Sequence, residues 1–243
     1  MIAFKVIQIE RLLTILMLIK KRNLFSSWIF IAIILICLLF AAFSYAVDFE
    51  KLQTSFIQKF GVGPLPNFNA WHTMMLSVKD LKDEDKLKRV NEFFNRRVAW
   101  GEDQAIWSQA DYWATPIETI AKGVGDCEDF AIAKYFTLIN LGIPVGKLRL
   151  VYVKAKVSNL PNSIDQAHMV LAYYFNPQAE PLIMDNQITE IRPASRRPDL
   201  TPIFSFNSEG IYLGVSGNDE QSGKSKLSRW QDLLQRVQLE GLN

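Results

Sequence analysis

The spacing of apolar residues changes midway along the chain, and this change constrains the fold more than any other feature of the sequence. In the first half, apolar side chains recur every three or four positions, as on one face of a helix. From Lys147 to Lys156 they alternate with polar side chains, as in a strand with one buried face. Helices followed by antiparallel strands predict an α+β domain in which N-terminal helices pack on an antiparallel sheet.

Individual elements follow from the same spacing and from the glycines and prolines that interrupt it. We expect helices at Phe49–Phe60, Asn69–Val78, Asp83–Trp100 and Cys127–Leu141, and a closing amphipathic helix that carries Leu227 and Val237. We expect strands at Lys147–Lys156, His168–Phe175, Pro181–Met184, Ile203–Phe206 and Gly210–Gly214. Polar loops are predicted at Ser158–Gln166 and Gly217–Lys226.

Residues 1–46 differ in kind from the rest of the chain. The uncharged run Trp28–Phe43 follows three consecutive basic residues and precedes small residues suited to peptidase cleavage after Ala46, which predicts a signal peptide. A retained membrane anchor is the alternative, because the uncharged stretch widens to Leu24–Val47 and could span a bilayer. In either case the domain at 47–243 is expected in the periplasm.

The charge of the chain is concentrated in this N-terminal segment. The whole sequence has 27 Lys and Arg against 25 Asp and Glu, a net charge of +2. The first 46 residues hold five basic residues and one acidic residue, which leaves 22 and 24 for the remainder. A domain so close to neutral gives no reason to expect nucleic acid as a partner.

Cysteine is scarce in a way that suggests chemistry. The chain has two cysteines, and Cys37 lies inside the apolar N-terminal run. Removal of the signal peptide leaves Cys127 as the only thiol, so no internal disulfide can form. A lone cysteine in an oxidising compartment is either buried and inert or retained for its reactivity.

Cys127 is predicted to begin a buried helix directly after the turn at Gly123 and Gly125. The unpaired amides and the dipole of a helix N-terminus favour a thiolate, which is the nucleophilic form. A nucleophilic cysteine also needs a base and a group that orients the base. His168 begins one predicted strand and Asp185 ends the next, so adjacent antiparallel strands would bring them together as a Cys-His-Asp triad.

The same residues could serve structure alone, with Cys127 in packing, His168 at a strand end and Asp185 in a turn. The position of the one thiol at a glycine-led helix start favours the triad. His72, the other histidine, stands beside Trp71 without a nucleophile or metal ligand nearby in sequence, and we expect it to be structural.

Four short motifs resemble those of the bacterial transglutaminase-like cysteine proteinases, a branch of the papain superfamily, and in particular the periplasmic LapG proteases. They are Tyr112–Pro116 (YWATP), Gly125–Asp129 (GDCED), Gln166–Val170 (QAHMV) and Met184–Asn186 (MDN). The resemblance implies a papain-like, transglutaminase-like core over most of residues 47–243.

The resemblance also implies an activity and partners. Cys127 would be the nucleophile, His168 the general base and Asp185 the residue that orients it. The protease would cut a large cell-surface adhesin near a pair of alanines in its N-terminal region, which releases the adhesin and disperses a biofilm. An inner-membrane receptor that binds cyclic di-GMP would capture the protease and hold its activity in check.

Three acids surround the predicted nucleophile: Asp126, Glu128 and Asp129. They could simply cap the helix and interact with its dipole. However, their charges should raise the pKa of the thiol and oppose its activation, a conflict that a bound cation would remove. Carboxylates without His or Cys select a hard ion such as Ca²⁺, and the resemblance likewise implies calcium held by these acids.

Other functions remain open at this point. The same triad could transfer the acyl group to an amine, as a transglutaminase does, and the fold could serve as a binding module without turnover. Trp113 could contribute an indole N–H to an oxyanion hole, or it could be a buried aromatic anchor. A receptor could block activity by covering the cleft near Trp113 and His168.

Overall fold

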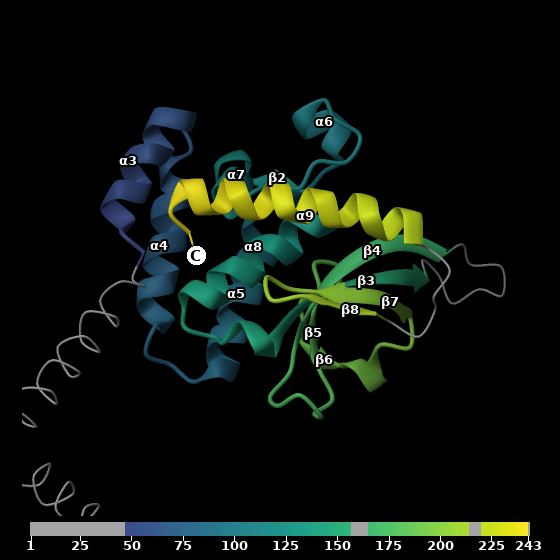
Figure 1. Cartoon of the computed structure of the whole chain (residues 1–243). Helices are drawn as coiled ribbons and strands as arrows, with labels where there is room; N and C mark the ends of the chain where they lie inside the picture. Colours follow the sequence, from purple (N-terminus) through teal and green to yellow (C-terminus); the bar gives the residue numbers. More distant parts are fainter. Residues whose placement is uncertain (1–46, 157–164, 214–219, 243) are drawn as a thin grey trace, which may run out of the picture. The chain divides into compact units, whose positions relative to one another are not determined.

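The computed structural model describes residues 47–156, 165–213 and 220–242 (Figure 1). The predicted signal peptide or anchor at 1–46 lies outside the described residues. Residues 158–164 and 217–219 of the two predicted polar loops, and Gly214 at the end of the last predicted strand, also lie outside them. No helix in the described ranges combines the length and the apolar character needed to cross a membrane.

The N-terminal half of the domain is helical. Its helices are α3 (Phe49–Phe60), α4 (Leu65–Val78), α5 (Asp83–Arg97), α6 (Asp103–Trp107), α7 (Pro116–Lys122) and α8 (Cys127–Asn140). Helix α3 has the predicted bounds, and His72 stacks on its Phe49 with ring centroids 4.1 Å apart. Helix α4 begins at Leu65 rather than Asn69. A proline is tolerated in its first turn because the N–H groups there have no partner within the helix, so the missing N–H of proline costs no hydrogen bond.

Helix α5 ends at Arg97, so the predicted extension to Trp100 is wrong. Residues Ala99–Trp100 instead form strand β1, which pairs in parallel with β2 (Val124–Gly125) and places Trp100 opposite Gly125. Pairing with a distant segment overrides the local helical spacing here. The pairing sets Trp100 beside the turn that leads into Cys127.

The second half forms one six-stranded sheet in which every neighbouring pair is antiparallel. Its order is β6 (Arg192–Pro193), β5 (Leu182–Met184), β4 (Asp165–Tyr173), β3 (Leu148–Lys156), β7 (Leu200–Phe206) and β8 (Ile211–Leu213). This sheet with its preceding helices confirms the predicted α+β class.

The closing helix α9 (Glu220–Glu240) is longer than predicted. It covers 220–226, which we expected to be loop, because Glu, Gln and Lys in this stretch favour helix and outweigh its glycine and serines. Trp230 of this helix packs edge-on against Phe206 of β7, with ring centroids 5.1 Å apart.

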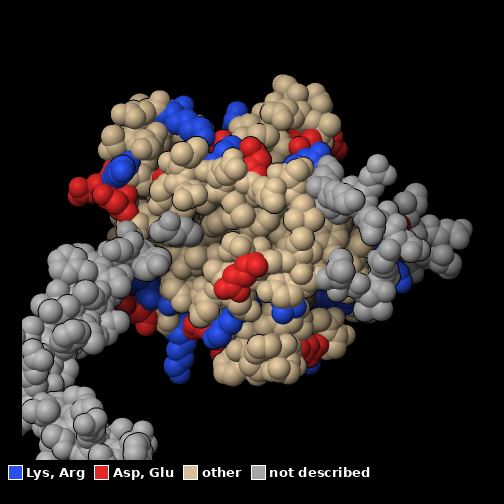
Figure 2. Space-filling view, in the orientation of Figure 1, with Lys and Arg blue, Asp and Glu red and all other residues tan. Residues whose placement is uncertain are grey.

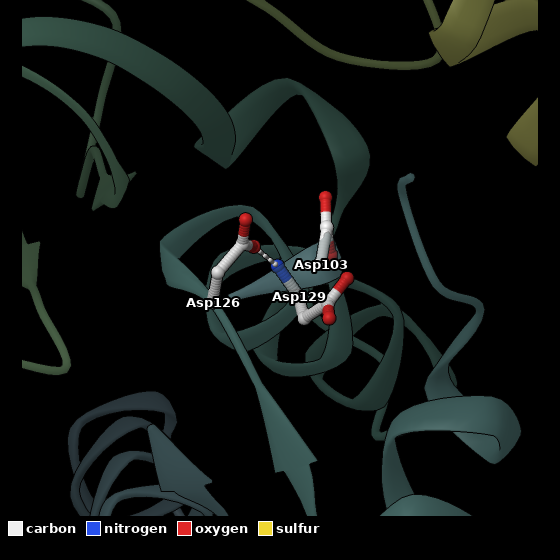
Figure 3. Close-up of side chains that lie close together, drawn as sticks. All are labelled: Asp103, Asp126 and Asp129. Atoms are coloured by element: carbon white, nitrogen blue, oxygen red, sulfur yellow. Dashed lines mark hydrogen bonds between the residues drawn. The ribbon is translucent and has the colours of Figure 1, made fainter. Parts of the chain in front are cut away.

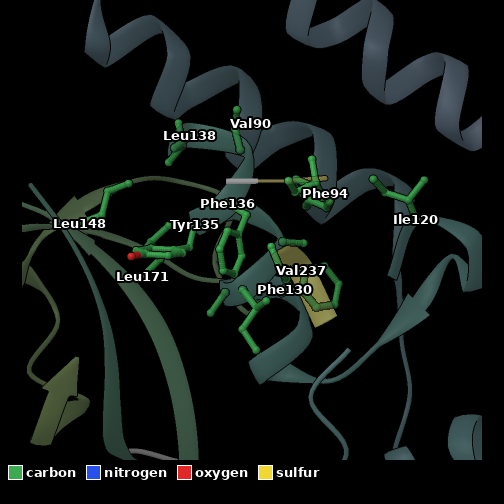
Figure 4. Close-up of a cluster of buried hydrophobic side chains, with 14 of the residues drawn as sticks. Val90, Phe94, Ile120, Phe130, Tyr135, Phe136, Leu138, Leu148, Leu171 and Val237 are labelled. Atoms are coloured by element: carbon green, nitrogen blue, oxygen red, sulfur yellow. The ribbon is translucent and has the colours of Figure 1, made fainter. Parts of the chain in front are cut away.

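Helix α8 lies at the centre of the hydrophobic core. Every residue from Glu128 to Leu138 is buried, and the helix contacts strands β3 and β4 as well as helices α5 and α7. Figure 4 shows its aromatic side chains among residues of α5, α9 and the sheet. A helix that is covered on all sides has little freedom to shift, so its first residue, Cys127, is held firmly in place.

Charged residues of both signs lie mainly around the rim of the face drawn in Figure 2, and uncharged side chains occupy much of its centre. This face shows no extended basic surface. The absence of a nucleic-acid partner remains a prediction from the charge balance.

Candidate active site

Cys127 is the first residue of α8 and lies in the wall of a cleft. The side chain of Asp126 caps the helix by accepting hydrogen bonds from the amides of Glu128 and Asp129, at 3.1 and 3.4 Å. Cys127 and His168 both line this cleft, whose volume is about 320 Å³. Other lining residues are Trp100, Glu102, Asp103, Gln104, Ala110, Asp126, Glu128, Gln166, Ala167, Asn186 and Gln187.

His168 and Asp185 are paired beneath the cleft. The imidazole Nε2 lies 2.9 Å from Asp185 Oδ1, and both side chains are almost completely buried. Asp185 Oδ1 also accepts a hydrogen bond from the amide of Gln187 at 3.0 Å. Burial alone would raise the pKa of Asp185, but its hydrogen bonds and the charge of its partners lower it to about 2.

The surroundings of the Cys127 thiol oppose its ionisation. Burial raises its pKa well above the ordinary value, and the charges of Glu128 and Asp126 raise it further. Cys127 Sγ donates a hydrogen bond to Glu128 Oε2 at 2.7 Å, while the amide of Met169 favours the thiolate. The conflict that the sequence suggested, acids opposing the activation of a thiol, is therefore present in the geometry.

Three aspartates form a compact cluster beside this thiol (Figure 3). Asp103, Asp126 and Asp129 each offer one carboxylate oxygen, and these oxygens lie within 4.8 Å of one another. Burial raises the pKa of Asp126 to about 8 and that of Asp129 well above its ordinary value, and repulsion among neighbouring carboxylates adds to both. Protons or a cation must therefore balance the charge of this cluster.

Asp129 is the most confined member of the cluster. It is fully buried; Oδ1 accepts from the Ala114 amide at 2.8 Å, and Oδ2 has no hydrogen-bond partner among the described residues. A Cβ at Gly125 would lie 2.7 Å from Asp129 Cβ, so only glycine allows this close approach. A buried carboxylate oxygen without a donor, facing two other carboxylates, fits a hard divalent cation.

The cluster differs in one member from the set predicted from the sequence. Asp126 and Asp129 belong to it, whereas Glu128 lies at the Cys127 thiol and Asp103 takes the third place. Asp103 lies on α6, where its Oδ2 accepts from the amide of Tyr112. Nothing in the local sequence marks Asp103, because only the fold brings α6 to the start of α8.

Trp113 is buried, and its ring stacks on Phe206 at 5.8 Å. Its carbonyl oxygen accepts a hydrogen bond from Arg236 of α9 at 2.6 Å. These contacts give Trp113 the anchoring position that the sequence analysis considered, next to Ala114, whose amide holds Asp129.

A family model and the similar solved structures indicate the same protein family. A family model described as bacterial transglutaminase-like cysteine proteinase matches residues 70–198. Legionella pneumophila LapG is 38% identical and has a TM-score of 0.65; the match covers 79% of this chain and 99% of that chain. An EGTA-treated form of LapG is 37% identical with a TM-score of 0.66, and a calcium-bound form is 38% identical with a TM-score of 0.65. No curated protein sequence matches the chain.

The fold and these similarities define a cysteine protease with a transglutaminase-like core. More narrowly, the chain belongs to the bacterial transglutaminase-like cysteine proteinases and is similar to LapG over most of the described domain.

Proposed function

We propose that this protein is a calcium-dependent periplasmic endopeptidase that cleaves a large cell-surface adhesin near a pair of alanines in its N-terminal region. The observation that carries the proposal is the shared cleft of Cys127 and His168, with His168 paired to the buried carboxylate of Asp185. Membership of the protease family supports peptide hydrolysis as the reaction.

In this reaction Cys127 is the nucleophile, His168 carries the protons, and Asp185 orients His168. With Nε2 donating to Asp185, Nδ1 of His168 keeps its lone pair and takes the proton of the Cys127 thiol. The sulfur then attacks the peptide carbonyl, and the imidazolium returns the proton to the leaving amine as the C–N bond breaks. Water, deprotonated by His168, hydrolyses the thioester and restores the thiol. Asp185 stays ionised and stabilises the imidazolium throughout.

Asp103, Asp126 and Asp129 are the residues that would hold calcium, with further oxygens completing the shell. When bound, the ion would supply positive charge that offsets these carboxylates and so favours the thiolate of Cys127. Two observations support calcium: the buried oxygen of Asp129 without a donor, and the calcium-bound form of the similar LapG. Glu128, the third acid of the GDCED motif, acts on the thiol directly through its hydrogen bond.

The biological setting follows from the family resemblance. Cleavage would release the adhesin from the cell surface and disperse a biofilm. An inner-membrane receptor for cyclic di-GMP would sequester the protease through its periplasmic domain. The cleft offers one exposed aromatic residue, Trp100, at its rim, which suits contact with a protein substrate or receptor.

The pairing of His168 with Asp185 gives a direct test of the reaction. Purified variants His168→Gln and Asp185→Asn are assayed for cleavage of an adhesin N-terminal fragment that contains a dialanine, with calcium present. His72→Gln is the matched control, since it changes the other histidine. We expect cleavage by wild type and His72→Gln, and loss of at least about 1,000-fold in kcat for the two triad variants. Full activity of either triad variant would refute the assignment, and transfer of a labelled amine in place of hydrolysis would indicate a transglutaminase.

A further inference from the structure

Arg197 lies directly behind the His168–Asp185 pair, and the reaction as described does not use it. It follows a short 3₁₀ turn at Ala194–Arg196, and its side chain is only 2% exposed. An arginine is almost never buried to this degree without a specific partner. Its neighbour Arg196 is exposed, so the chain directs the second arginine of the pair inward.

The guanidinium of Arg197 bridges two carboxylates. Its Nη2 donates to Asp185 Oδ2 at 2.8 Å and to Asp199 Oδ2 at 2.7 Å. Its Nε donates to Asp199 Oδ1 at 3.0 Å. The planar fork of arginine is thus fixed by Asp199 on one side and presented to Asp185 on the other.

These bonds complete the surroundings of the Asp185 carboxylate. Oδ1 faces the imidazole of His168 and the amide of Gln187, and Oδ2 faces Arg197. The backbone is held as well, because Asn95 Nδ2 donates to the Asp185 carbonyl at 2.7 Å. A partial rotation of the carboxylate about its Cβ–Cγ bond would break the bond to Arg197, so this bond fixes the plane of the carboxylate and keeps one oxygen directed at the imidazole.

The charges around Asp185 suit catalysis, as does the geometry described above. A lone buried arginine next to Asp185 would oppose formation of the imidazolium on His168. Asp199 offsets that positive charge, and its side chain is 32% exposed, so it is also in contact with solvent. Lys134 of α8 also interacts with Asp185 through its charge, and its Nζ has no hydrogen-bond partner within the described part of the chain.

We propose that Arg197, anchored by Asp199, is a positioning residue that holds the Asp185 carboxylate toward His168 during catalysis. The catalytic half of this statement rests on the proposed function, whereas the orientation of the pair can be measured without any substrate. The local sequence gives no sign of this role, since Arg197 lies in a polar stretch where arginine is ordinarily solvated.

The experiment compares Arg197→Met, Arg197→Lys and the matched control Arg196→Met in the purified protein. The first readout is the proton NMR signal of the imidazole Nε2–H, which appears far downfield when the proton is held by a buried carboxylate. The protein has only two histidines, so His168→Gln assigns this signal. The second readout is the separation of kcat from KM for cleavage of the dialanine fragment. Thermal melting verifies that each variant is folded.

We expect Arg197→Met to lose or shift the downfield signal and to lower kcat by about 100-fold with little change in KM. Arg197→Lys should recover part of both, because an ammonium keeps the charge but not the fork, and Arg196→Met should match wild type. A folded Arg197→Met with a wild-type signal and kcat would overturn the proposal. If Arg197→Met does not fold, wild-type values of both readouts in Arg197→Lys would overturn the role of the fork. Absence of cleavage by wild type would count against the proposed function, while the signal would still test the orientation.

Discussion

Replacement of Lys134 by methionine should stabilise this protein. Lys134 lies on α8, about two helical turns beyond Cys127, and its side chain is fully buried. Its Nζ has no hydrogen-bond partner among the described residues, and the ring centroid of Phe130 lies 5.7 Å from it. Burial lowers the pKa of Lys134 to about 7, although the charge of Asp185 favours the protonated form.

The size of the effect follows from this difference in pKa. In the unfolded chain the amine titrates near its ordinary value of 10.5, so at pH 7 folding costs about 4 kcal/mol at this position. Because the folded pKa is lowered, the penalty is full below pH 7 and disappears as the pH rises toward 10.5. Methionine has a similar length and no charge. We therefore expect Lys134→Met to raise the free energy of unfolding by about 2–4 kcal/mol at pH 7.

Urea unfolding followed by tryptophan fluorescence, at several pH values from 7 to 10, measures this quantity. The advantage of Lys134→Met over wild type should shrink by about 1.4 kcal/mol per pH unit across this range. Lys86 provides the matched control, because it is also buried but its Nζ donates to the Leu141 carbonyl at 2.8 Å. Lys86→Met should therefore destabilise the protein. A Lys134→Met variant that is less stable than wild type, or an advantage independent of pH, would refute this reasoning.

Three further predictions concern the cluster and the cleft. Gly125→Ala should weaken calcium binding by roughly tenfold or more, measured by titration calorimetry, because the added Cβ would displace Asp129. In the control Gly63→Ala the added Cβ meets no atom within 4 Å, so calcium binding should be unchanged. In chelator, the free energy of unfolding should fall as the pH rises from about 4 to 8, because the carboxylates of Asp126 and Asp129 keep their protons in the folded protein and release them in the unfolded chain. Parallel pH profiles of this free energy with and without calcium would contradict the prediction. Trp100→Ala should raise KM for the dialanine fragment by about tenfold with kcat retained, since this tryptophan is 62% exposed at the cleft; an unchanged KM would exclude substrate contact.

Much of the fold could be predicted from the sequence because its signals are local. The spacing of Leu52 and Phe56 marked helix α3, and the alternation in Lys147–Lys156 marked strand β3. The glycines before Cys127 marked the start of α8. Each of these features depends on residues close together in the chain, where helical and extended periods are distinct.

What the sequence could not give depends on contacts between distant segments. Asp103 joins Asp126 only because α6 folds over the start of α8, and Trp100 leaves the helical pattern only because it pairs beside Gly125. Lys134 is another case, since a lysine within a helical pattern is ordinarily assigned to solvent, yet α8 is covered on all sides. The polar contacts of a site are fixed by tertiary structure, and a linear pattern does not record them.

Calcium-dependent cleavage tests the central claim most directly. The protein from Val47 onward and its Cys127→Ala variant are incubated with an adhesin N-terminal fragment containing a dialanine, each in calcium and in chelator. We predict cleavage by wild type alone, lost in chelator and restored when calcium is returned. Cleavage by Cys127→Ala equal to that of wild type would contradict the assignment of the nucleophile, and wild-type cleavage unaffected by chelator would contradict the role of the aspartate cluster.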